Sequence, residues 1–375
     1  MSAAPRTLLH VFSTFKVGGP QMRFARLANH YGADFRHRIV AMDGAVDAFE
    51  LLDKGLDAEI IPTPPRAGGT LAQLRSFRRI LGQVRPDVLV TQNWGTIEWA
   101  MANIDGHTPH LHMEDGFGPE EAGGQLPRRV WTRRLVLRRS TVMLPSSTLY
   151  RIASEIWKLP RQRLIQVPNG IDCARFARPA DPVFAGALGI ARDRPVIGTV
   201  AALRAEKNLL RLIEAFHLLP ADIGAQLAIV GGGPQRPALE ARVAELGLGD
   251  RVVFTGACAE PDRLLPSFSV FAMSSDTEQM PLSLLEAMAA GLPVAATDVG
   301  DVKEMAAAEN APFIVPLEAE RLAEAIAGLL ADPARAAAIG AANAVRARAE
   351  YDQSRMFATY RTLFDPVSLN RRAAA

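Results

Sequence analysis

Two glutamates stand eight residues apart, on either side of the start of an apolar helical pattern. Glu278 lies in a polar turn after the short apolar run 270–273, and Glu286 lies inside the pattern of residues 282–290. The turn therefore joins the carboxyl end of a predicted strand to the amino end of a predicted helix, where open α/β sheets bind ligands. The unpaired N–H groups of a helix start suit a phosphate, whereas carboxylates suit hydroxyls.

A ligand with one phosphate region and several hydroxyls would satisfy both features, and a nucleotide sugar is such a ligand. Pro281 fits the first turn of the helix, because the N–H that proline lacks has no partner there, and Gly291 fits its end. The alternative interpretation is that Glu278 is a solvated loop charge and that Glu286 lies on the exposed face of the helix, as most isolated charges do.

The same stretch resembles the E-x7-E signature of the retaining glycosyl transferases group 1 (family 4), which adopt the two-domain GT-B fold. The matching residues are Glu278, Pro281, Leu285, Glu286, Ala287, Met288, Ala289, Gly291, Pro293 and Val294. Gln279 replaces the glycine that usually follows the first glutamate. The resemblance implies that Glu286 holds ribose hydroxyls and that Glu278 holds or positions the donor sugar. The donor-binding residues that it implies around the turn are Glu278, Met280, Pro281, Leu282 and Glu286.

Arg204 and Lys207 follow a predicted strand, in the string LRAEKN. When a glycosidic bond to phosphate breaks, negative charge grows on the leaving diphosphate, and fixed cations stabilise that transition state. The resemblance extends to this R-x-x-K pair and implies that both residues bind the donor diphosphate. No D-x-D triplet is present, the nearest being residues 276–278, so we expect no metal and no cofactor, with a nucleotide-diphosphate sugar as co-substrate. The alternative is that the two cations form surface salt bridges with Glu206 or Glu214.

Three glycine turns follow predicted strands. Gly18 and Gly19 come after the first strand, where paired glycines let the backbone approach a ligand, although a plain tight turn is the alternative. The turn 231–234 lacks the lysine of a P-loop and the spacing of a dinucleotide-binding loop, which excludes ATPases and dehydrogenases. By resemblance, Gly18 and Gly19 face the donor phosphates and the acceptor, and the loop at Gly256 covers the nucleotide base.

The densest polar cluster of the first half is PHLHMEDGFG, at the end of a predicted strand over residues 109–118. Strand alternation would put His110, His112 and Glu114 on one face. Members of the resembled family place a histidine near the transferred sugar at this strand end. His112 is the best match, Asp115 is the alternative, and Glu114 and Asp115 are candidates for an acceptor or sugar site. A metal site would need a non-standard ligand spacing, and a structural role for the histidines stays open.

Apolar runs alternate with helical patterns along the chain, which predicts βα units and parallel sheets. The expected strands are residues 7–14, 38–42, 59–62, 88–91, 109–113, 141–145, 164–167, 196–202, 226–230, 251–255, 270–273, 293–297 and 313–315. The fold class is α/β, with two doubly wound Rossmann-like domains that, by resemblance to GT-B proteins, face each other across a cleft. We expect an N-terminal acceptor-binding domain (1–170) and a C-terminal nucleotide-sugar-binding domain (171–350). A C-terminal helix within 351–375 would cross back to the first domain and be followed by a tail.

The composition is that of a soluble globular protein, with 49% hydrophobic and 22% charged residues and no apolar run of the roughly 18 residues that span a membrane. The N-terminus lacks a basic region followed by a long apolar core, so no secretory signal is expected. Two cysteines cannot form a disulfide framework, which fits a reducing, cytoplasmic location.

Residues 1–168 carry a net charge of +7 and the remainder −5, which indicates an anionic partner for the first half. Nucleic acid is not expected, because no motif for it is found.

Two basic stretches could meet an anionic membrane from the cytoplasmic side. Residues 71–85 predict an amphipathic helix, with apolar side chains on one face and arginines on the other. Residues 128–139 carry six arginines around Trp131 and three aliphatic side chains, without a clean division between faces. Each arginine near an anionic leaflet contributes about 1 kcal/mol. The alternative is a solvated basic surface. The arginines expected at the membrane are Arg133, Arg134, Arg138 and Arg139.

Together these features predict a retaining, metal-independent glycosyltransferase of the hexosyltransferase type. It would move a sugar from a nucleotide-diphosphate sugar to a glycan or lipid-linked acceptor, in cell-envelope, exopolysaccharide or glycolipid synthesis. The family implies same-face attack through an oxocarbenium-like transition state, with the leaving phosphate oxygen taking the acceptor proton. The expected catalytic residues are His112, Glu278, Arg204 and Lys207. The alternatives are a GT-B sugar-nucleotide 2-epimerase and a catalytically inactive GT-B binding protein.

Overall fold

The computed structural model describes residues 4–63, 69–117, 119–121 and 124–369, and the chain divides into two compact units. The first unit runs to Pro168 and resumes at Phe357, and the second unit is Asn169–Met356. The sequence indicates these divisions after residues 170 and 350. Residues 370–375 of the expected C-terminal tail lie outside the described residues.

The first unit is built on a parallel seven-stranded sheet in the order β3-β2-β1-β4-β5-β6-β7. Its strands are β1 (Arg6–Phe12), β2 (Phe35–Ala41), β3 (Ala58–Ile60), β4 (Val88–Gln92), β5 (His110–Met113), β6 (Thr141–Leu144) and β7 (Leu164–Gln166). Its α-helices are α1 (Gly19–Tyr31), α2 (Gly69–Val84), α3 (Ile97–Ala102), α4 (Pro127–Val136) and α5 (Ser147–Arg151). The strand order reverses between β1 and β4, so a ligand crevice is expected at the carboxyl ends of these two strands.

The second unit is built on a parallel six-stranded sheet in the order β10-β9-β8-β11-β12-β13. Its strands are β8 (Val196–Val200), β9 (Gln226–Val230), β10 (Val252–Gly256), β11 (Val270–Met273), β12 (Val294–Thr297) and β13 (Ile314–Val315). Its α-helices are α6 (Cys173–Phe176), α7 (Pro182–Ala187), α8 (Leu209–His217), α9 (Arg236–Glu245), α10 (Pro261–Leu264), α11 (Leu282–Ala289), α12 (Val302–Met305), α13 (Ala319–Ala331) and α14 (Pro333–Glu350). Here the order reverses between β8 and β11.

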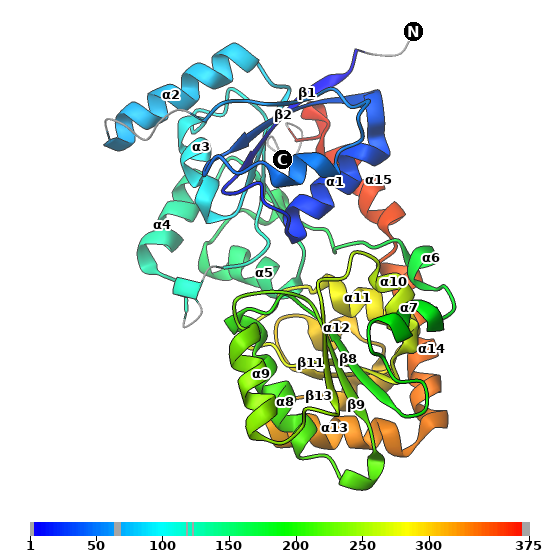
Figure 1. The fold of residues 1–375 in the computed structure, drawn as a ribbon. Helices are drawn as coiled ribbons and strands as arrows, with labels where there is room; N and C mark the ends of the chain where they lie inside the picture. Colours follow the sequence, from blue (N-terminus) through cyan, green and yellow to red (C-terminus); the bar gives the residue numbers. More distant parts are fainter. Residues whose placement is uncertain (1–3, 64–68, 118, 122–123, 370–375) are drawn as a thin grey trace. The chain divides into compact units, whose positions relative to one another are not determined.

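The second sheet lies between two apolar layers, with helices on both sides (Figure 1). Successive strand residues face opposite sides. Phe271 therefore belongs to one core cluster, with residues of α11, whereas Val270 and Ala272 belong to the other, with residues of α8 and α13. Strands covered on both faces are apolar throughout. For this reason each strand predicted from an apolar run is found, and the predicted α/β fold class is confirmed.

The C-terminal helix α15 (Gln353–Leu363) begins in the second unit and continues in the first. The Tyr31 hydroxyl donates to the Phe357 carbonyl oxygen, and the ring of Phe364 packs edge-on against Phe35. Among the described residues no single helix is long and apolar enough to cross a membrane. Only α13 and α14 taken together meet the requirements of length and composition, and they are bent by 104° at their junction.

Candidate active site

Two loops meet at the carboxyl ends of β8 and β11. The loop after β8 carries Arg204 and Lys207, and the loop after β11 carries Glu278. Lys207 Nζ donates to Glu278 Oε1, and the Ser275 hydroxyl donates to the same oxygen over 2.8 Å. Lys207 and Glu278 line a small pocket of about 10 Å³ that is partly open to solvent. The other residues that line it are Thr199, Val200, Ala201, Leu209, Met273, Ser274, Ser275 and Ser283.

Arg204 extends toward solvent from the same loop as Lys207. Its side chain is 61% exposed, and its guanidinium lies 4.0 Å from Glu206, at the outer limit of an ion pair. Glu214 pairs with Arg242 over 2.6 Å. The surface salt bridges proposed as the alternative therefore reduce to the one weak contact between Arg204 and Glu206. A phosphate could reach most of the Arg204 guanidinium.

The helix of the signature, α11, begins at Leu282, as the sequence predicts. Pro281 is predicted in its first turn but is the N-cap, with an extended ψ of 126°. The other end is as predicted, because Gly291 has a φ of +77°. The Gly291 N–H donates to the Met288 carbonyl over 3.0 Å, and the Leu292 N–H donates to the Ala287 carbonyl over 3.1 Å. This pattern is a Schellman motif, which satisfies the last carbonyls of the helix.

Glu286 is only 9% exposed, so its interpretation as an exposed surface charge is wrong. The pKa of Arg175 is raised, first by its hydrogen bond to Asp262 and also by the charges of Asp262 and Glu286. Met280 is also buried, and its carbonyl accepts a hydrogen bond from Asn169 Nδ2 over 3.0 Å. Met280 therefore anchors the loop after β11 to the segment that contains Asn169.

Glycine is required where a neighbouring loop approaches Glu278. Gly300 has a φ of +56°, and a Cβ there would lie 2.1 Å from the Glu278 carbonyl oxygen. The Asp301 N–H donates to the Gln279 carbonyl over 3.2 Å, which ties the two loops together. Gln279 itself does not adopt a positive φ. The side chain that replaces the usual glycine therefore causes no backbone strain at this position.

The loop that carries Arg204 rests on the turn after β9. A Cβ at Gly231 would lie 1.8 Å from the Ala201 carbonyl oxygen, and one at Gly233 would lie 2.5 Å from the Leu203 carbonyl oxygen. The Gly231 N–H donates over 2.8 Å to the carbonyl of Gly256, which has a φ of +77°. The glycines at 231 and 233 therefore give the Arg204 loop the room that it needs.

In the first unit, the predicted glycine pair starts α1. Gly18 is the N-cap, with an extended backbone, and Gly19 is the first helical residue. A Cβ at Gly19 would meet no atom within 4 Å, so the fold does not require glycine there. The predicted contact of this pair with donor phosphates remains a prediction.

The histidines of β5 lie inside the first unit. His112 is fully buried, with Nδ1 2.8 Å from Thr91 Oγ1 and Nε2 3.6 Å from a Glu114 carboxylate oxygen. His110 contacts the same Thr91 hydroxyl over 2.8 Å and the Ser140 hydroxyl over 2.7 Å. The predicted shared face of His110, His112 and Glu114 is therefore found. Because His112 and Glu114 have no exposed surface, neither can contact a sugar or acceptor in this structure, contrary to the expectation for both.

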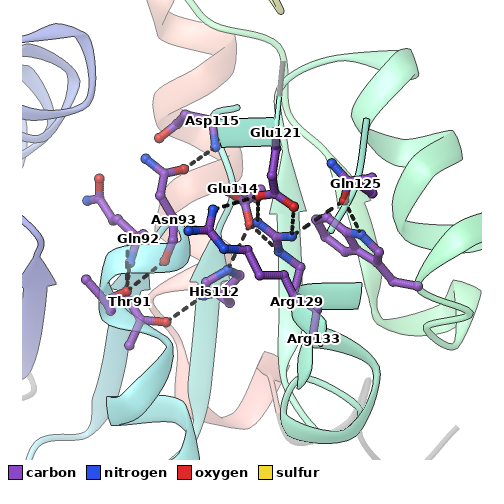
Figure 2. Close-up of polar contacts among 12 residues, drawn as sticks. Thr91, Gln92, Asn93, His112, Glu114, Asp115, Glu121, Gln125, Arg129 and Arg133 are labelled. Carbon is purple, nitrogen blue, oxygen red and sulfur yellow. Dashed lines mark hydrogen bonds and ion pairs between the residues drawn. The ribbon is translucent and has the colours of Figure 1, made fainter. Parts of the chain in front are cut away.

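Arg133 is the centre of a buried charge cluster, whereas the sequence predicts it at a membrane surface. It is 1% exposed, makes two hydrogen bonds of 3.1 Å to Glu121, and lies 3.3 Å from Glu114 (Figure 2). The rings of Trp157 and Trp94 lie 4.7 and 5.1 Å from its guanidinium. Burial alone would raise the pKa of Glu121, but the hydrogen bonds and charge of Arg133 lower it below the usual value. The cluster holds the segment after β5 against α4.

Helix α4 also has two distinct faces, which the sequence does not indicate. Arg133 and Val136 are buried, whereas Trp131 is 58% exposed and Leu135 is 64% exposed. The exposed residues Arg128, Trp131, Leu135 and Arg138 follow helical spacing along one side.

Asp115 lies at the end of β5, on the side opposite to His112. Its carboxylate accepts two hydrogen bonds from Arg23 of α1, over 2.6 and 2.8 Å. Its N–H donates to Asn93 Oδ1 over 2.7 Å (Figure 2). The Asp115 side chain is 14% exposed. Of the polar residues at this strand end, Asp115 is thus the one that reaches the surface. Arg23 was not predicted, because nothing local in the sequence pairs it with a residue 92 positions away.

Within the described part of the chain, no three His, Cys, Asp or Glu side chains are grouped as a metal site would need. The carboxylate of Asp276, in the nearest approach to a D-x-D triplet, accepts hydrogen bonds from Asn208 over 3.0 and 3.2 Å.

Two family models match the chain in sequence. "Glycosyl transferase 4-like domain" covers residues 18–170, and "Glycosyl transferases group 1" covers residues 183–346. The putative glycosyltransferase EpsF of Bacillus subtilis is 36% identical over 315 residues, which are 80% of this chain and 80% of that protein. A GDP-mannose-dependent monoacylated alpha-(1-6)-phosphatidylinositol monomannoside mannosyltransferase of Corynebacterium glutamicum is 29% identical and covers 94% and 95% of the two chains.

A solved structure with the same fold is that of Alr3699/HepE from Anabaena, in complex with UDP. The two folds superpose with a TM-score of 0.80 at 18% identity, over 95% of this chain and 98% of the other. This likeness supports the two-domain GT-B fold that the sequence predicts. Together with the EpsF relative, which is matched over four fifths of its length, the two family models show that the chain belongs to the glycosyl transferases group 1 family.

Proposed function

We propose that this chain transfers a sugar from a nucleotide-diphosphate sugar to an acceptor hydroxyl, with retention of configuration and without a metal ion. The observation that carries the proposal is the contact of Lys207 with Glu278 at the ends of β8 and β11, with the exposed Arg204 on the same loop. The names of similar proteins agree with such a donor, since one depends on GDP-mannose and another was solved with UDP.

In the proposed reaction, the bond between the sugar C1 and the diphosphate oxygen breaks, and its electron pair leaves with the diphosphate. Lys207 and Arg204 stabilise the negative charge that grows there. The acceptor hydroxyl bonds to C1 from the same face, and its proton passes to the leaving phosphate oxygen. Glu278 accepts hydrogen bonds from the donor sugar, and Glu286 accepts them from the ribose.

For the acceptor side we assign Asp115 in place of His112. Asp115 reaches the surface at the carboxyl end of β5, whereas His112 is fully buried. Gly18 and Gly19 start α1, the helix whose Arg23 binds Asp115. The assignment therefore places the start of α1, with Gly18 and Gly19, and the end of β5, with Asp115, in one proposed site.

The purified full chain tests the proposal with UDP-glucose, UDP-N-acetylglucosamine and GDP-mannose. A bound donor at 100 times its Kd should stabilise the fold by about 2.7 kcal/mol, seen as a thermal shift. Turnover is followed as release of UDP or GDP, with water as the acceptor of the sugar, and should persist in EDTA. Loss in EDTA with recovery in Mg²⁺ would contradict metal independence, and a changed nucleotide sugar without transfer would indicate an epimerase. Binding without turnover would indicate an inactive binding protein.

Two substitutions test the assigned cations. Arg204→Ala and Lys207→Ala should each lower turnover by roughly 10²–10³, the scale for lost transition-state stabilisation. Arg321→Ala is the control, because Arg321 is a half-exposed surface cation of the same unit that pairs with Glu324. Near-normal turnover in both site variants would remove the pair from the reaction.

We further propose that the acceptor is lipid-linked and that the enzyme meets an anionic membrane through α4. The name of the Corynebacterium relative includes a phosphatidylinositol acceptor. The exposed stripe of Arg128, Trp131, Leu135 and Arg138 presents apolar side chains between cations, as interfacial helices do.

Cosedimentation with anionic vesicles should exceed that with neutral vesicles and fall with salt. Replacement of Trp131 and Leu135 by Ser should abolish it, and equal recovery in both supernatants would indicate a soluble acceptor.

A further inference from the structure

The side chain of Asp276 is one of those that join the two loops of the proposed donor site. We propose that Asp276 is a positioning residue, which sets the placement of Lys207 relative to Glu278 without contacting the donor. The inference rests on the proposed function, since it concerns the same site. Asp276 is not among the residues that line the pocket, so it would act through its neighbours.

The carboxylate of Asp276 binds two side chains of the β8 side. Asn208 Nδ2 donates to its two oxygens over 3.0 and 3.2 Å, and Arg211 lies 2.7 Å from Oδ1. Arg211 also donates to the Ser274 carbonyl over 2.7 Å, so its guanidinium spans the end of β11. Two partners from α8 and its N-cap thus converge on a single carboxylate in the β11 loop.

The backbones of the two loops are linked beside this carboxylate. The Asp276 N–H donates to the Glu206 carbonyl over 2.9 Å, and the Ser274 hydroxyl donates to the Lys207 carbonyl over 3.1 Å. These bonds flank Lys207 on one loop and lie two to four residues before Glu278 on the other. A shift of Asp276 would therefore be passed directly to both charged groups.

Asn208 shows why the loop needs this support. It adopts a left-handed conformation, with φ +40° and ψ +52°, and its Oδ1 accepts a hydrogen bond from the Arg211 N–H as the N-cap of α8. A non-glycine residue in this region carries strain, which persists where the surroundings hold it in place. The amide of Asn208 is held at its oxygen by α8 and at its nitrogen by Asp276. Lys207 directly precedes Asn208, so its direction depends on this conformation.

Asp276→Ala is the direct test, with Asp276→Asn as the conservative variant. The alanine variant should lower turnover at least tenfold, because small misplacements of catalytic groups are costly, while the Kd for UDP or GDP changes less than about threefold. The asparagine variant keeps an acceptor oxygen and should fall between wild type and alanine. Glu214→Ala is the control, because it removes a comparable ion pair, that with Arg242, from the same unit.

Hydrogen–deuterium exchange gives a readout that does not depend on turnover. In Asp276→Ala, amides of residues 201–208 should exchange faster than in wild type, and in Glu214→Ala they should not. Unchanged exchange there, or turnover equal to wild type, overturns the positioning role. If wild type turns over none of the three nucleotide sugars, the proposed function fails, and the exchange result still decides whether Asp276 orders the loop.

Discussion

One carboxylate oxygen of Glu278 accepts hydrogen bonds from both Lys207 and Ser275. A nucleoside diphosphate that binds Lys207 must displace this contact and then lies beside a negative charge. For a nucleotide sugar this repulsion is partly offset, because the sugar hydroxyls can donate hydrogen bonds to the Glu278 carboxylate after Lys207 has moved to the diphosphate.

Glu278→Gln should therefore tighten the binding of UDP or GDP while lowering turnover. The side chains of the pair are 24% and 11% exposed, and partly exposed ion pairs contribute about 0.2–1 kcal/mol, so the gain should be up to about fivefold. Calorimetric titration measures it. Glu206→Gln removes a nearby carboxylate that does not contact Lys207, and it controls for the general change in charge. Weaker diphosphate binding in Glu278→Gln would show that the carboxylate does not compete.

The types of the site residues could be predicted from the sequence, but not their pairing. Glu278, Arg204 and Lys207 were expected near one another from their charge and position, and the structure places them on the two loops at the ends of β8 and β11. The Lys207–Glu278 contact spans 71 residues and depends on β8 and β11 being neighbours in the sheet, which a local pattern does not reveal. The burial of His112 could not be predicted either, because strand alternation predicts which residues share its face of the sheet but not whether that face is covered.

Helices α11 and α14 pack closely through a pair of glycines. A Cβ on Gly340, in α14, would lie 2.0 Å from the carbonyl oxygen of Gly291, which ends α11. That oxygen belongs to backbone, so it cannot move aside as a flexible side chain would. The contact therefore fixes how near α14 can come to the helix that carries Glu286.

Gly340→Ala should destabilise the second unit by about 1–3 kcal/mol, as overpacking does. Differential scanning calorimetry measures the change. Gly82→Ala is a matched control, because Gly82 is inside α2 and a Cβ there meets no atom within 4 Å. That variant should be stabilised by roughly 0.5–1 kcal/mol, the usual difference between alanine and glycine in a helix. Equal shifts in both variants would mean that the glycine contact is not tight.

The buried and exposed faces of α2 could be predicted from its sequence, whereas those of α4 could not. In α2 Phe77 is buried, Leu74, Leu81 and Val84 are half-buried, and Arg75 and Arg79 are exposed, so the two predicted faces are found. In α4, where the sequence shows no clean division between faces, Arg133 is buried and Trp131 is exposed. A cation is rarely buried unless an opposite charge pairs with it. Glu114 and Glu121, which pair with Arg133, come from outside the helix, so the sequence of α4 alone could not indicate that Arg133 is buried.

Arg133→Gln should destabilise the first unit by about 3–5 kcal/mol, because it leaves the buried Glu114 without its cation. Arg138→Gln, at an exposed position just beyond α4, should have little effect. Tryptophan fluorescence is a suitable readout, because all four tryptophans lie in the first unit, at Trp94, Trp99, Trp131 and Trp157. Equal unfolding midpoints for the two variants would contradict the structural role of the cluster.

At the scale of the whole chain, the order of buried and exposed segments was predictable, whereas the exact limits of the units were not. Apolar runs indicate strands wherever both faces of a sheet are covered, and this held in both units. The change of unit at Phe357 occurs inside α15, a continuous helix. A helical pattern carries no mark of such a change, so the sequence could indicate a returning helix but not the residue at which it leaves the second unit.

Three buried histidines make the stability of the first unit depend on pH. Burial lowers the pKa of His10 well below its ordinary value, with the charge of His37 as a second cause. Burial also lowers the pKa of His37 to about 4 and that of His110 to about 3. The unfolded chain takes up protons near pH 6.5, whereas the folded unit cannot accept them until the pH is much lower. Protonation below pH 6.5 therefore favours the unfolded state.

Stability of the first unit should fall as the pH decreases from about 6.5 toward 4, by up to about 1.4 kcal/mol per pH unit for each histidine. Urea unfolding followed by tryptophan fluorescence, at constant ionic strength, measures the slope. His110→Gln should flatten it, because an amide can still bind Thr91 and Ser140 but does not titrate in this range. Constant or rising stability over the same pH range would show that the histidines accept protons without unfolding.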